Sequence, residues 1–401
     1  MSGVVIIGAG HAAGQAAASL RQAKYEGSIT IVGDEAHIPY QRPPLSKAYL
    51  KGEQSADKVY LRAESFYADR DITMKLNTTA TAIDTAAKTV ALSTGETLSY
   101  DYLLISTGSR PRKLSIEGSD LPGIHYLRTM DDVDGLREGM RPDANLVIVG
   151  GGYIGLEVAA VGRELGLNVH VLEMEERILQ RVTTPEMSAY YHQLHEGRGV
   201  HIHTSTGVTG FAGDGKVEEV ICGDQRFAAD IVIVGIGIIA NTELAEAASI
   251  HCDNGIVVDE HCRTSDPFVY AAGDCTNHPN PLLDRRLRLE SVPNAMDQAR
   301  VSTANMMGED KTYAAIPWFW SDQYELKLQM VGFSADGDSQ VLRGDMATNQ
   351  FAVFYLKDGK IVAADAVNSP KEFMLCKQLV GKPADPALLA DPASDLKALL
   401  A

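Results

Sequence analysis

The stretch that decides the fold lies near the start of the chain and reads Val4-Val5-Ile6-Ile7-Gly8-Ala9-Gly10-His11-Ala12-Ala13-Gly14. Its β-branched run predicts a buried strand, and the alanine-rich sequence that continues through Leu20 predicts a helix. In the turn between them, Gly8 permits the sharp bend, Gly10 lets the backbone approach a pyrophosphate, and Ala13 lets the helix pack closely on the strand. The sequence therefore predicts a strand–turn–helix unit that holds a dinucleotide at the positive end of its helix.

Two acids follow the next apolar run of this unit. Ile29–Val32 predicts a second strand, and Asp34 and Glu35 come shortly after it. Carboxylates at this distance from a glycine-rich turn accept hydrogen bonds from the ribose hydroxyls of a dinucleotide.

The whole unit occurs a second time. Leu146–Val149 predicts a strand, a helix follows through about Leu165, and Val169–Leu172 predicts the next strand, which is followed by Glu173. The turn of this copy reads Gly150-Gly151-Gly152-Tyr153-Ile154-Gly155. One such turn can arise from packing alone, but two complete units indicate two dinucleotide sites in an α/β fold with two Rossmann-like domains.

Composition excludes several classes of function. The 401 residues include 36 Lys and Arg against 53 Asp and Glu, and the resulting net charge of −17 repels nucleic acid and anionic lipid. The longest apolar run, Ile231–Ala240, is too short to span a bilayer, and nothing before Val4 resembles an export signal. We expect a cytoplasmic protein without a membrane or nucleic-acid partner.

The cysteines and histidines give no metal motif. Five cysteines, without a CxxC pair, argue against a disulfide framework and against structural zinc: Cys222, Cys252, Cys262, Cys275 and Cys376. Four histidines are interpreted as incidental: His192, His195, His201 and His203. No metal is therefore expected.

Three further motifs carry a resemblance to a known superfamily. They are the proline-stiffened segment Pro39–Lys47 and two strand-to-glycine junctions, Tyr102–Gly108 and Val269–Asp274. Together with the two dinucleotide units, they resemble the glutathione-reductase-like flavoproteins. That resemblance implies FAD at the first unit, a nicotinamide dinucleotide at the second, and a contact of Gly273-Asp274 with the flavin. If Gly273-Asp274 stood alone, a loop aspartate that caps a turn would be the favoured interpretation.

The second unit favours NADH over NADPH. Glu173, followed by Glu175 and Glu176, would bind a 2′-hydroxyl through a charged hydrogen bond of about 1.5 to 3 kcal/mol and would repel a 2′-phosphate. Arg177 lies close enough in the sequence to accommodate such a phosphate, so NADPH stays open.

The sequence lacks the thiols that disulfide reductases of this superfamily carry after the first unit. No cysteine precedes Cys222. Electrons from NADH must therefore leave to oxygen, to a quinone, or singly to a protein carrier.

Four motifs narrow the resemblance to the putidaredoxin-reductase-type ferredoxin reductases. They are Tyr40–Lys47, Gly150–Glu157, Glu290–Ala295 and Pro317-Trp318-Phe319-Trp320-Ser321-Asp322-Gln323. The resemblance implies that hydride passes from NADH to FAD and that single electrons pass to a [2Fe–2S] ferredoxin, which supplies a monooxygenase or a ring-hydroxylating dioxygenase. Alternatives on the same scaffold are an NADH oxidase or quinone reductase, and a flavin-bearing, redox-regulated interaction protein related in fold to apoptosis-inducing factor.

Carried over by position, the resemblance implies FAD contacts at Ala12, Asp34, Arg42, Lys47, Ala80, Arg128, Asp274 and Val292. The other predicted cofactor-binding residues lie in the two glycine turns, at their acids, at the later glycine junctions and beside the ring: Gly8, Gly10, Ala13, Glu35, Thr107, Gly108, Gly150, Gly152, Tyr153, Ile154, Gly155, Glu173, Gly237, Gly273, Glu290 and Trp320. A helix that begins near Val292 would direct its positive end at the charge of a reduced flavin.

Three residues are predicted to take part in the chemistry: Lys47, Glu157 and Trp320. Lys47 would stabilise negative charge on the reduced ring, and Glu157 would pair with it or orient the nicotinamide amide. Trp318 and Trp320 alternate as in a strand, and the resemblance favours Trp320 as the residue that covers the flavin, with Trp318 as the alternative. Solvated charges and core tryptophans are the competing interpretations.

The predicted organisation has three domains. A discontinuous FAD-binding domain covers residues 1–111 and 246–318, an NAD-binding domain covers residues 112–245, and a C-terminal α+β interface domain covers residues 319–401. Runs at Lys327–Gly332, Gln350–Leu356 and Lys360–Ala364 predict an antiparallel sheet in the last domain, which closes with helical stretches. Because ferredoxins are typically acidic, a local positive face is expected, with candidates Arg285, Arg286, Arg288 and Arg300.

Overall fold

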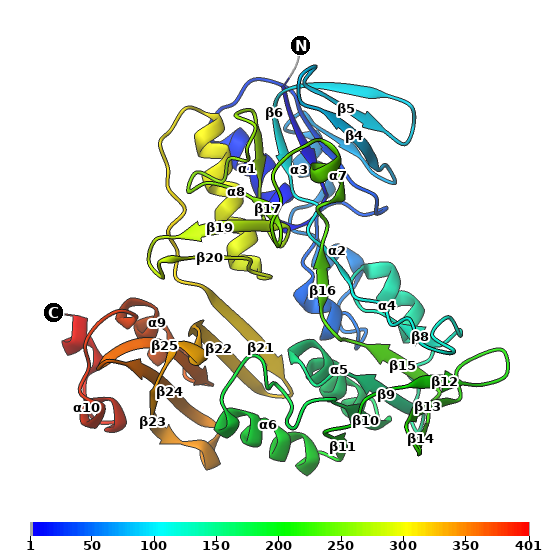
Figure 1. Cartoon of the computed structure of the whole chain (residues 1–401), viewed down its shortest axis with the longest axis vertical. Helices are drawn as coiled ribbons and strands as arrows, with labels where there is room; N and C mark the ends of the chain where they lie inside the picture. The colour runs from blue at the N-terminus through cyan, green and yellow to red at the C-terminus, as the bar shows by residue number, and fades with distance from the viewer. Residues whose placement is uncertain (1–2, 401) are drawn as a thin grey trace. The chain divides into compact units, whose positions relative to one another are not determined.

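The computed structural model describes residues 3–400 and divides into two compact units, and the course of the chain is drawn in Figure 1. The first unit contains the chain up to Gln41, Ala56–Arg110 and Ile238–Pro317. The second contains Arg42–Ser55, Pro111–Gly237 and the chain from Trp318. Each unit is therefore built from segments that are distant in the sequence. No helix within residues 3–400 is both long and apolar enough to cross a membrane.

The first unit is organised around a sheet in the order β3-β2-β1-β6-β5-β4, with β18 paired to β6. Five of its strands are parallel: β1 Gly3–Ile7, β2 Ile29–Val32, β3 Ile72–Lys75, β6 Thr97–Ile105 and β18 Val269–Ala271. Two others add an antiparallel ribbon: β5 Thr89–Leu92 and β4 Ala80–Asp84. The parallel core is the doubly wound arrangement that the sequence predicts.

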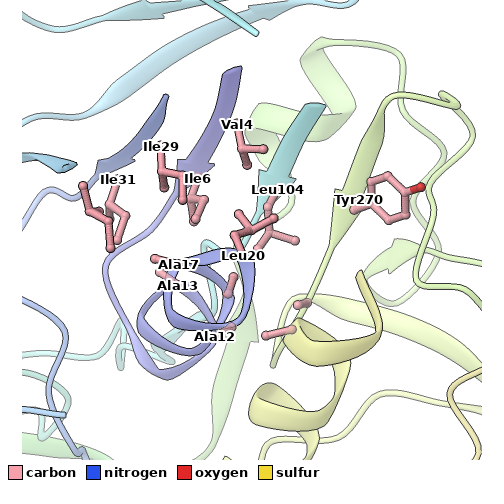
Figure 2. Packing of buried hydrophobic residues seen from close by; sticks show 14 of the residues in the cluster. Val4, Ile6, Ala12, Ala13, Ala17, Leu20, Ile29, Ile31, Leu104 and Tyr270 are labelled. Carbon is pink, nitrogen blue, oxygen red and sulfur yellow. The ribbon is translucent and has the colours of Figure 1, made fainter. Parts of the chain in front are cut away.

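Two helices cover one face of this sheet. Helix α1, His11–Gln22, contacts helix α8, Val292–Met306, and both pack on the strands. Figure 2 shows the alanines of α1 beside the apolar side chains of β1 and β2, and Ala13 and Ala17 are fully buried there. Because alanine is small, α1 lies close to the sheet, and its first residues begin directly at the carboxyl end of β1.

The remaining elements of the first unit are short. Three are helices: α2 Ala56–Val59, α3 Glu64–Ala68 and α7 Glu243–Ala247. The others are two small strand groups: β7 Ser109–Pro111 with β16 Ile238–Ala240, and β17 Ile256–Val257 with β19 Thr276–Asn280 and β20 Arg285–Leu287.

The second unit begins with a parallel sheet in the order β11-β10-β9-β15-β8. Its strands are β8 Ile124–His125, β9 Asn145–Val149, β10 Asn168–Leu172, β11 Val200–His203 and β15 Ile231–Val234. Its helices are η1 Pro43–Ser46, α4 Met130–Arg137, α5 Tyr153–Glu164 and α6 Pro185–Gly197. A small antiparallel sheet adds β12 Gly210–Ala212, β13 Glu219–Cys222 and β14 Gln225–Ala228.

A five-stranded antiparallel sheet in the order β21-β22-β25-β24-β23 completes the second unit. Its strands are β21 Trp318–Gln323, β22 Leu326–Gly332, β23 Ser339–Asp345, β24 Gln350–Lys357 and β25 Lys360–Val367. The helical segments are η2 Ser334–Asp336, η3 Met346–Thr348, α9 Pro370–Leu379, α10 Pro386–Ala390 and η4 Leu396–Leu400. The three predicted strands and the closing helices are confirmed, whereas β23 was not predicted.

The predicted fold class, two Rossmann-like domains and a C-terminal α+β domain, is confirmed. The exact domain boundaries stay a prediction, and the compact units group the residues differently in two respects. Residues 42–55 belong to the second unit, and the predicted NAD-binding domain, as far as Gly237, lies in one unit with the C-terminal domain, while residues 238–245 belong to the first unit. Those two domains share a buried apolar cluster, which includes Leu156, Met187, Tyr191, Leu326, Phe351 and Tyr355.

Candidate functional site

The turn after β1 leaves room for a pyrophosphate. Gly8 has φ +101°, and a Cβ added there would lie 2.2 Å from the carbonyl oxygen of Ser106, so only glycine fits. A Cβ at Gly10 would meet no described atom within 4 Å. Gly10 is the N-cap of α1, and no described side chain caps this helix or places an acid in its first turn. The first N–H groups of α1 thus border open space of the kind that a phosphate fills.

The two acids after β2 lie in different environments. Asp34 is exposed, whereas Glu35 is half-buried and accepts a hydrogen bond from the Tyr40 hydroxyl at 2.5 Å. Asp34 is therefore the more accessible acceptor for ribose hydroxyls, while Glu35 also anchors Tyr40.

The predicted Gly-Asp junction lies beside the first turn. Gly273 has φ +91°, and a Cβ there would lie 3.6 Å from that of Ala295 and 3.8 Å from that of Ala12. The neighbouring Asp274 accepts a hydrogen bond from the Ser109 hydroxyl at 2.8 Å. The structure thus brings together the start of α1, the start of α8 and the junction, which a single flavin site requires.

Three other predicted residues lie on the same sheet. Gly108, with φ +61°, follows β6, and the Thr107 hydroxyl donates to the carbonyl oxygen of Asn241 at 2.7 Å. Ala80 opens β4 and packs on the apolar cluster at the opposite face from α1. No described contact joins Ala80 to the glycine turns, so its role stays a prediction.

The predicted helix start is confirmed. Val292 is the first residue of α8, and the N-cap Ser291 accepts from the backbone N–H of Asn294 at 3.3 Å. Glu290 lies just outside the helix, is exposed, and accepts a hydrogen bond from Arg288 at 2.5 Å.

The turn after β9 repeats the geometry of the first in the second unit. Gly150 has φ +109°, and a Cβ at Gly155 would lie 2.3 Å from the carbonyl oxygen of Gly150. Close packing of α5 on the turn therefore requires glycine at this position. A Cβ at Gly152, the N-cap of α5, would meet no described atom within 4 Å. Each copy of the turn therefore has two positions where only a small residue fits and one glycine that borders open space.

Glu173 reaches this turn from the end of β10. Its Oε2 accepts from the N–H of Gly151 at 2.7 Å, and its Oε1 accepts from the N–H of Glu175 at 2.9 Å. Arg177 donates to the carbonyl oxygens of Gln180 and Thr184 at 3.0 and 3.3 Å. A carboxylate, and not a guanidinium, therefore lies at the turn, which supports NADH as the substrate.

The other predicted residues of the second site have mixed roles. The Tyr153 hydroxyl donates to Sδ of Met330 at 2.9 Å, so this side chain ties α5 to the C-terminal sheet, and burial raises its pKa. Ile154 is 52% exposed beside it. Gly237 follows β15 with φ +105° and is exposed. Ile154 and Gly237 therefore remain accessible to a dinucleotide.

Lys47 and Glu157 meet in a buried cluster. Glu157 is 5% exposed, and its Oε2 accepts from Lys47 Nζ at 2.6 Å and from the Ser46 hydroxyl at 2.5 Å. Its Oε1 accepts from the Ser321 hydroxyl at 2.7 Å. Both serines were missed as functional candidates, although they lie within two of the motifs that define the resemblance. The interpretation of Lys47 and Glu157 as separately solvated charges is wrong.

Two predicted arginines also meet. Arg42 Nη1 donates to the carbonyl oxygen of Arg128 at 2.5 Å, and Asp132 Oδ2 accepts from the N–H of Arg128 at 3.0 Å. Both arginines therefore lie at the start of α4, in the second unit.

The two tryptophans of β21 lie on one face, as predicted. Their ring centroids are 5.6 Å apart. Trp318 also contacts the ring of Phe373 at 5.7 Å, and Lys377 Nζ lies 4.4 Å from its centroid. These contacts pack Trp318 on α9, and the role of Trp320 beside a flavin stays a prediction.

The histidines, the cysteines and the candidate docking arginines are not assigned to a site by the structure. Among residues 3–400, no group of His, Cys, Asp and Glu is arranged to hold a metal ion, and the five cysteines are free thiols. Of the candidate docking arginines, Arg285 is exposed, Arg286 donates to two backbone carbonyls, and Arg288 and Arg300 each pair with a neighbouring carboxylate. Docking at these positions stays a prediction.

Two glycine turns with open space at their helices, each followed by an acid, define a protein with two separate dinucleotide sites. Residues 2–299 match the family model for pyridine nucleotide-disulphide oxidoreductases, and residues 318–400 match the model for the reductase C-terminal domain. The chain belongs to the pyridine nucleotide-disulphide oxidoreductase family. Its members use FAD and NAD(H), so the predicted cofactors and the oxidoreductase class are confirmed.

Two relatives and one solved structure indicate a narrower group within this family. The chain is 45% identical to the putidaredoxin reductase of Pseudomonas putida over 407 residues, which cover 99% of this chain and 96% of the relative. It is 43% identical to the ferredoxin–NAD(+) reductase component of the anthranilate 1,2-dioxygenase system of Burkholderia cepacia over 404 residues, 99% of this chain and 98% of the relative. The crystal structure of a covalent putidaredoxin reductase–putidaredoxin complex matches with a TM-score of 0.96 at 45% identity, covering 100% of this chain and 98% of that chain. The resemblance to putidaredoxin-reductase-type enzymes is confirmed.

Proposed function

We propose that this chain is an NADH-dependent ferredoxin reductase, whose electrons pass singly to a [2Fe–2S] ferredoxin that supplies a monooxygenase or a ring-hydroxylating dioxygenase. The names of the two relatives and of the matching complex support this acceptor. A reducing cytoplasm is the proposed location, and the five free thiols are compatible with it.

The observation that carries the proposal is the cluster around Glu157. It joins Ser46 and Lys47 of the proline-stiffened segment, Ser321 of the tryptophan motif, and the helix that follows the second glycine turn. Three of the four motifs that carry the resemblance to putidaredoxin-reductase-type enzymes therefore meet at one carboxylate.

The residues present fit both cofactors. The open space at Gly10 and at Gly152 would admit the two pyrophosphates, and Asp34 and Glu173 would bind ribose hydroxyls. FAD, when bound, accepts a hydride from NADH and releases the two electrons one at a time.

The chain itself supplies charge and orientation. Lys47 pairs with Glu157 at 2.6 Å, so its Nζ is held in place and would stabilise negative charge beside it without rearrangement. Glu157 accepts hydrogen bonds from three donors, one of which is an ammonium, so its carboxylate is held in a fixed orientation. No described cysteine precedes Cys222, so the chain offers no thiol there to receive electrons.

Anaerobic stopped-flow spectroscopy tests the proposal. The FAD-loaded protein is mixed with NADH and then with a [2Fe–2S] ferredoxin, and we expect rapid bleaching of the flavin followed by reduction of the ferredoxin. Rapid return of the flavin absorbance only with oxygen or a quinone would instead identify an oxidase or quinone reductase. Bleaching over minutes, with a persistent charge-transfer band, would favour a redox-regulated interaction protein.

A further inference from the structure

A continuous row of buried hydrogen bonds leads away from Glu157 through the second unit. The Ser321 hydroxyl, which donates to Glu157 Oε1 at 2.7 Å, lies 3.1 Å from Gln323 Nε2. Gln323 Oε1 lies 2.8 Å from Nε2 of His195, and His195 Nδ1 lies 3.4 Å from the Tyr324 hydroxyl. The row thus links the end of β21 and the last turn of α6 to the carboxylate in α5.

The direction of each bond follows from the chemistry of the groups. A carboxylate only accepts, so the single proton of the Ser321 hydroxyl points at Glu157 and its oxygen must accept from Gln323. The amide oxygen of Gln323 then faces His195, which must donate from Nε2. His195 Nδ1 is left as an acceptor for Tyr324. Only a neutral imidazole with its proton on Nε2 satisfies the whole row.

Burial enforces this arrangement. Ser321 and Gln323 are each 1% exposed and His195 is fully buried, so a broken bond would leave a polar group without water. Burial also lowers the pKa of His195 to about 4, which keeps the ring neutral at physiological pH.

The backbone at the far end of the row is strained. Tyr324 has φ +54° in the two-residue turn between β21 and β22, a conformation that bulky side chains seldom adopt. Arg198 holds the tyrosine in place, with its guanidinium 4.9 Å from the ring centroid. Strain of this kind persists where surrounding contacts require it.

The row acts on one particular oxygen. Glu157 Oε2 already accepts from Lys47 and Ser46, whereas among residues 3–400 Oε1 accepts only from Ser321. A carboxylate oxygen has two acceptor sites, so Oε1 keeps one for a further donor. A nicotinamide dinucleotide has two N–H donors besides its ribose hydroxyls, the adenine amine and the nicotinamide carboxamide. The adenine belongs to the ADP-ribose portion, which the glycine turn and Glu173 would hold, so the carboxamide is the donor left for Oε1.

We propose that Ser321, Gln323 and His195 are positioning residues that fix Oε1 of Glu157 for the carboxamide of the nicotinamide ring. This inference rests on the proposed function, because it assumes that NADH is the hydride donor. None of the three side chains needs to touch the dinucleotide. Their effect is confined to its nicotinamide end, since the ADP-ribose portion is held by the glycine turn and Glu173.

Binding of two ligands separates this role from a merely structural one. Dissociation constants of NAD+ and of ADP-ribose, which lacks nicotinamide, are measured by calorimetry on the FAD-loaded protein. We expect Ser321→Ala and Gln323→Leu to weaken NAD+ binding by about fivefold to tenfold, the loss of one hydrogen bond to a charged group, with ADP-ribose unchanged. An unchanged ratio of the two constants would overturn the proposal.

Two controls complete the experiment. Ser188→Ala removes another serine hydroxyl from the same unit, 1% exposed and bonded to the carbonyl of Ile178, and should leave the ratio unchanged. His195→Gln retains an amide donor for Gln323 and should resemble the wild type, whereas His195→Leu should resemble Gln323→Leu. If Ser321→Ala fails to fold, the comparison of His195→Gln with His195→Leu tests the proposal through the same ratio of NAD+ and ADP-ribose dissociation constants. Ferredoxin reduction by the wild type tests the proposed function separately. The proposed function and the positioning role can therefore be contradicted independently of each other.

Discussion

At the scale of single residues, the Glu173 carboxylate ought to govern the choice of dinucleotide. Its two backbone contacts hold it at the second glycine turn. Glu173→Gln removes the charge, so we expect the KM for NADH to rise about tenfold, as a charged hydrogen bond is lost, and the preference over NADPH to shrink. Steady-state reduction of ferricyanide measures both. Glu176→Gln, an exposed neighbour, is the control, and equal effects in the two variants would contradict the assignment.

The site residues that the sequence predicts are those whose chemistry is local in sequence. Glycine turns and their acids carry fixed spacings, because one strand–turn–helix unit contains all of them. Ser321, Gln323 and His195 lack such a signal, since α6 and β21 are more than a hundred residues apart. His195 is not a predicted metal ligand, and the sequence gives no indication of its contact with Gln323 at 2.8 Å. Only the tertiary pairing of these elements reveals the row.

At the scale of elements, two glycines in the turn between β9 and α5 should have different roles, one in stability and the other in NAD+ binding. Gly155→Ala would place a Cβ 2.3 Å from the Gly150 carbonyl oxygen, and such overpacking costs about 1 to 3 kcal/mol. Gly152 has φ −79° and open space beside it, so Gly152→Ala should fold normally. It should nevertheless weaken NAD+ binding by about tenfold, or about 1.4 kcal/mol, because its methyl group fills the pyrophosphate space. Thermal unfolding and calorimetry measure the two effects, and normal NAD+ affinity in Gly152→Ala would count against the site.

The C-terminal segment depends on one buried arginine of β23. Arg343 is 7% exposed and donates to Ser394 and to the carbonyl oxygens of Leu389, Asp391 and Pro392. Arg343→Met leaves these acceptors unpaired, so we expect a loss of about 2 to 3 kcal/mol in the free energy of unfolding. Limited proteolysis should then cleave near α10.

The matched control for Arg343 is an exposed ion pair of the same unit. Arg226 contacts Glu219 at 3.0 Å on the surface, so Arg226→Met should change the free energy of unfolding by less than about 0.5 kcal/mol. Equal losses in urea denaturation would show that Arg343 contributes no more than a surface charge.

Strand β23 also shows why one element escaped prediction. It reads Ser-Gln-Val-Leu-Arg-Gly-Asp over Ser339–Asp345, and it lies at the edge of its sheet. Edge strands carry polar residues, so the apolar alternation that identified β22, β24 and β25 is missing. Its register is set by pairing with β24 and not by its own composition.

At the scale of the whole molecule, the segment Arg42–Ser55 was assigned by sequence continuity to the FAD-binding domain, yet it packs within the second unit. Tyr49 donates to Asp134 at 3.0 Å, and Lys51 pairs with Glu164 at 3.0 Å, in addition to the contact of Lys47 with Glu157. Charged contacts of this kind leave no periodic pattern in the sequence, so the sequence alone does not predict them. The fold class could be read from two repeated units, whereas the grouping of segments required the three-dimensional packing.

Buried histidines should make the protein sensitive to acid. Burial lowers the pKa of His170, His195 and His278 from 6.5 to about 4, with His201 and His203 contributing at His170. Between pH 6.5 and about pH 4, these histidines bind protons in the unfolded chain but stay neutral in the folded protein. The free energy of unfolding therefore decreases as the pH falls. Burial raises the pKa of Asp365 from 3.8 to about 6, and this single carboxyl acts in the opposite direction below pH 6. Burial also lowers the pKa of His125 and His203, so these histidines together outweigh the one carboxyl and leave a net loss. Each uncompensated proton changes the free energy of unfolding by about 1.4 kcal/mol per pH unit.

Differential scanning calorimetry between pH 7.5 and pH 5 measures this dependence, and we expect the transitions to move to lower temperature throughout the range. His278→Phe removes one of the three groups. It retains an aromatic ring against Tyr313, whose centroid lies 4.9 Å from that of His278, so packing is preserved. The transition of the first unit should therefore become less dependent on pH in this variant, while that of the second unit keeps its slope because His170 and His195 remain. A transition temperature that rises toward pH 5 in the wild type would show that these histidines accept protons inside the folded protein.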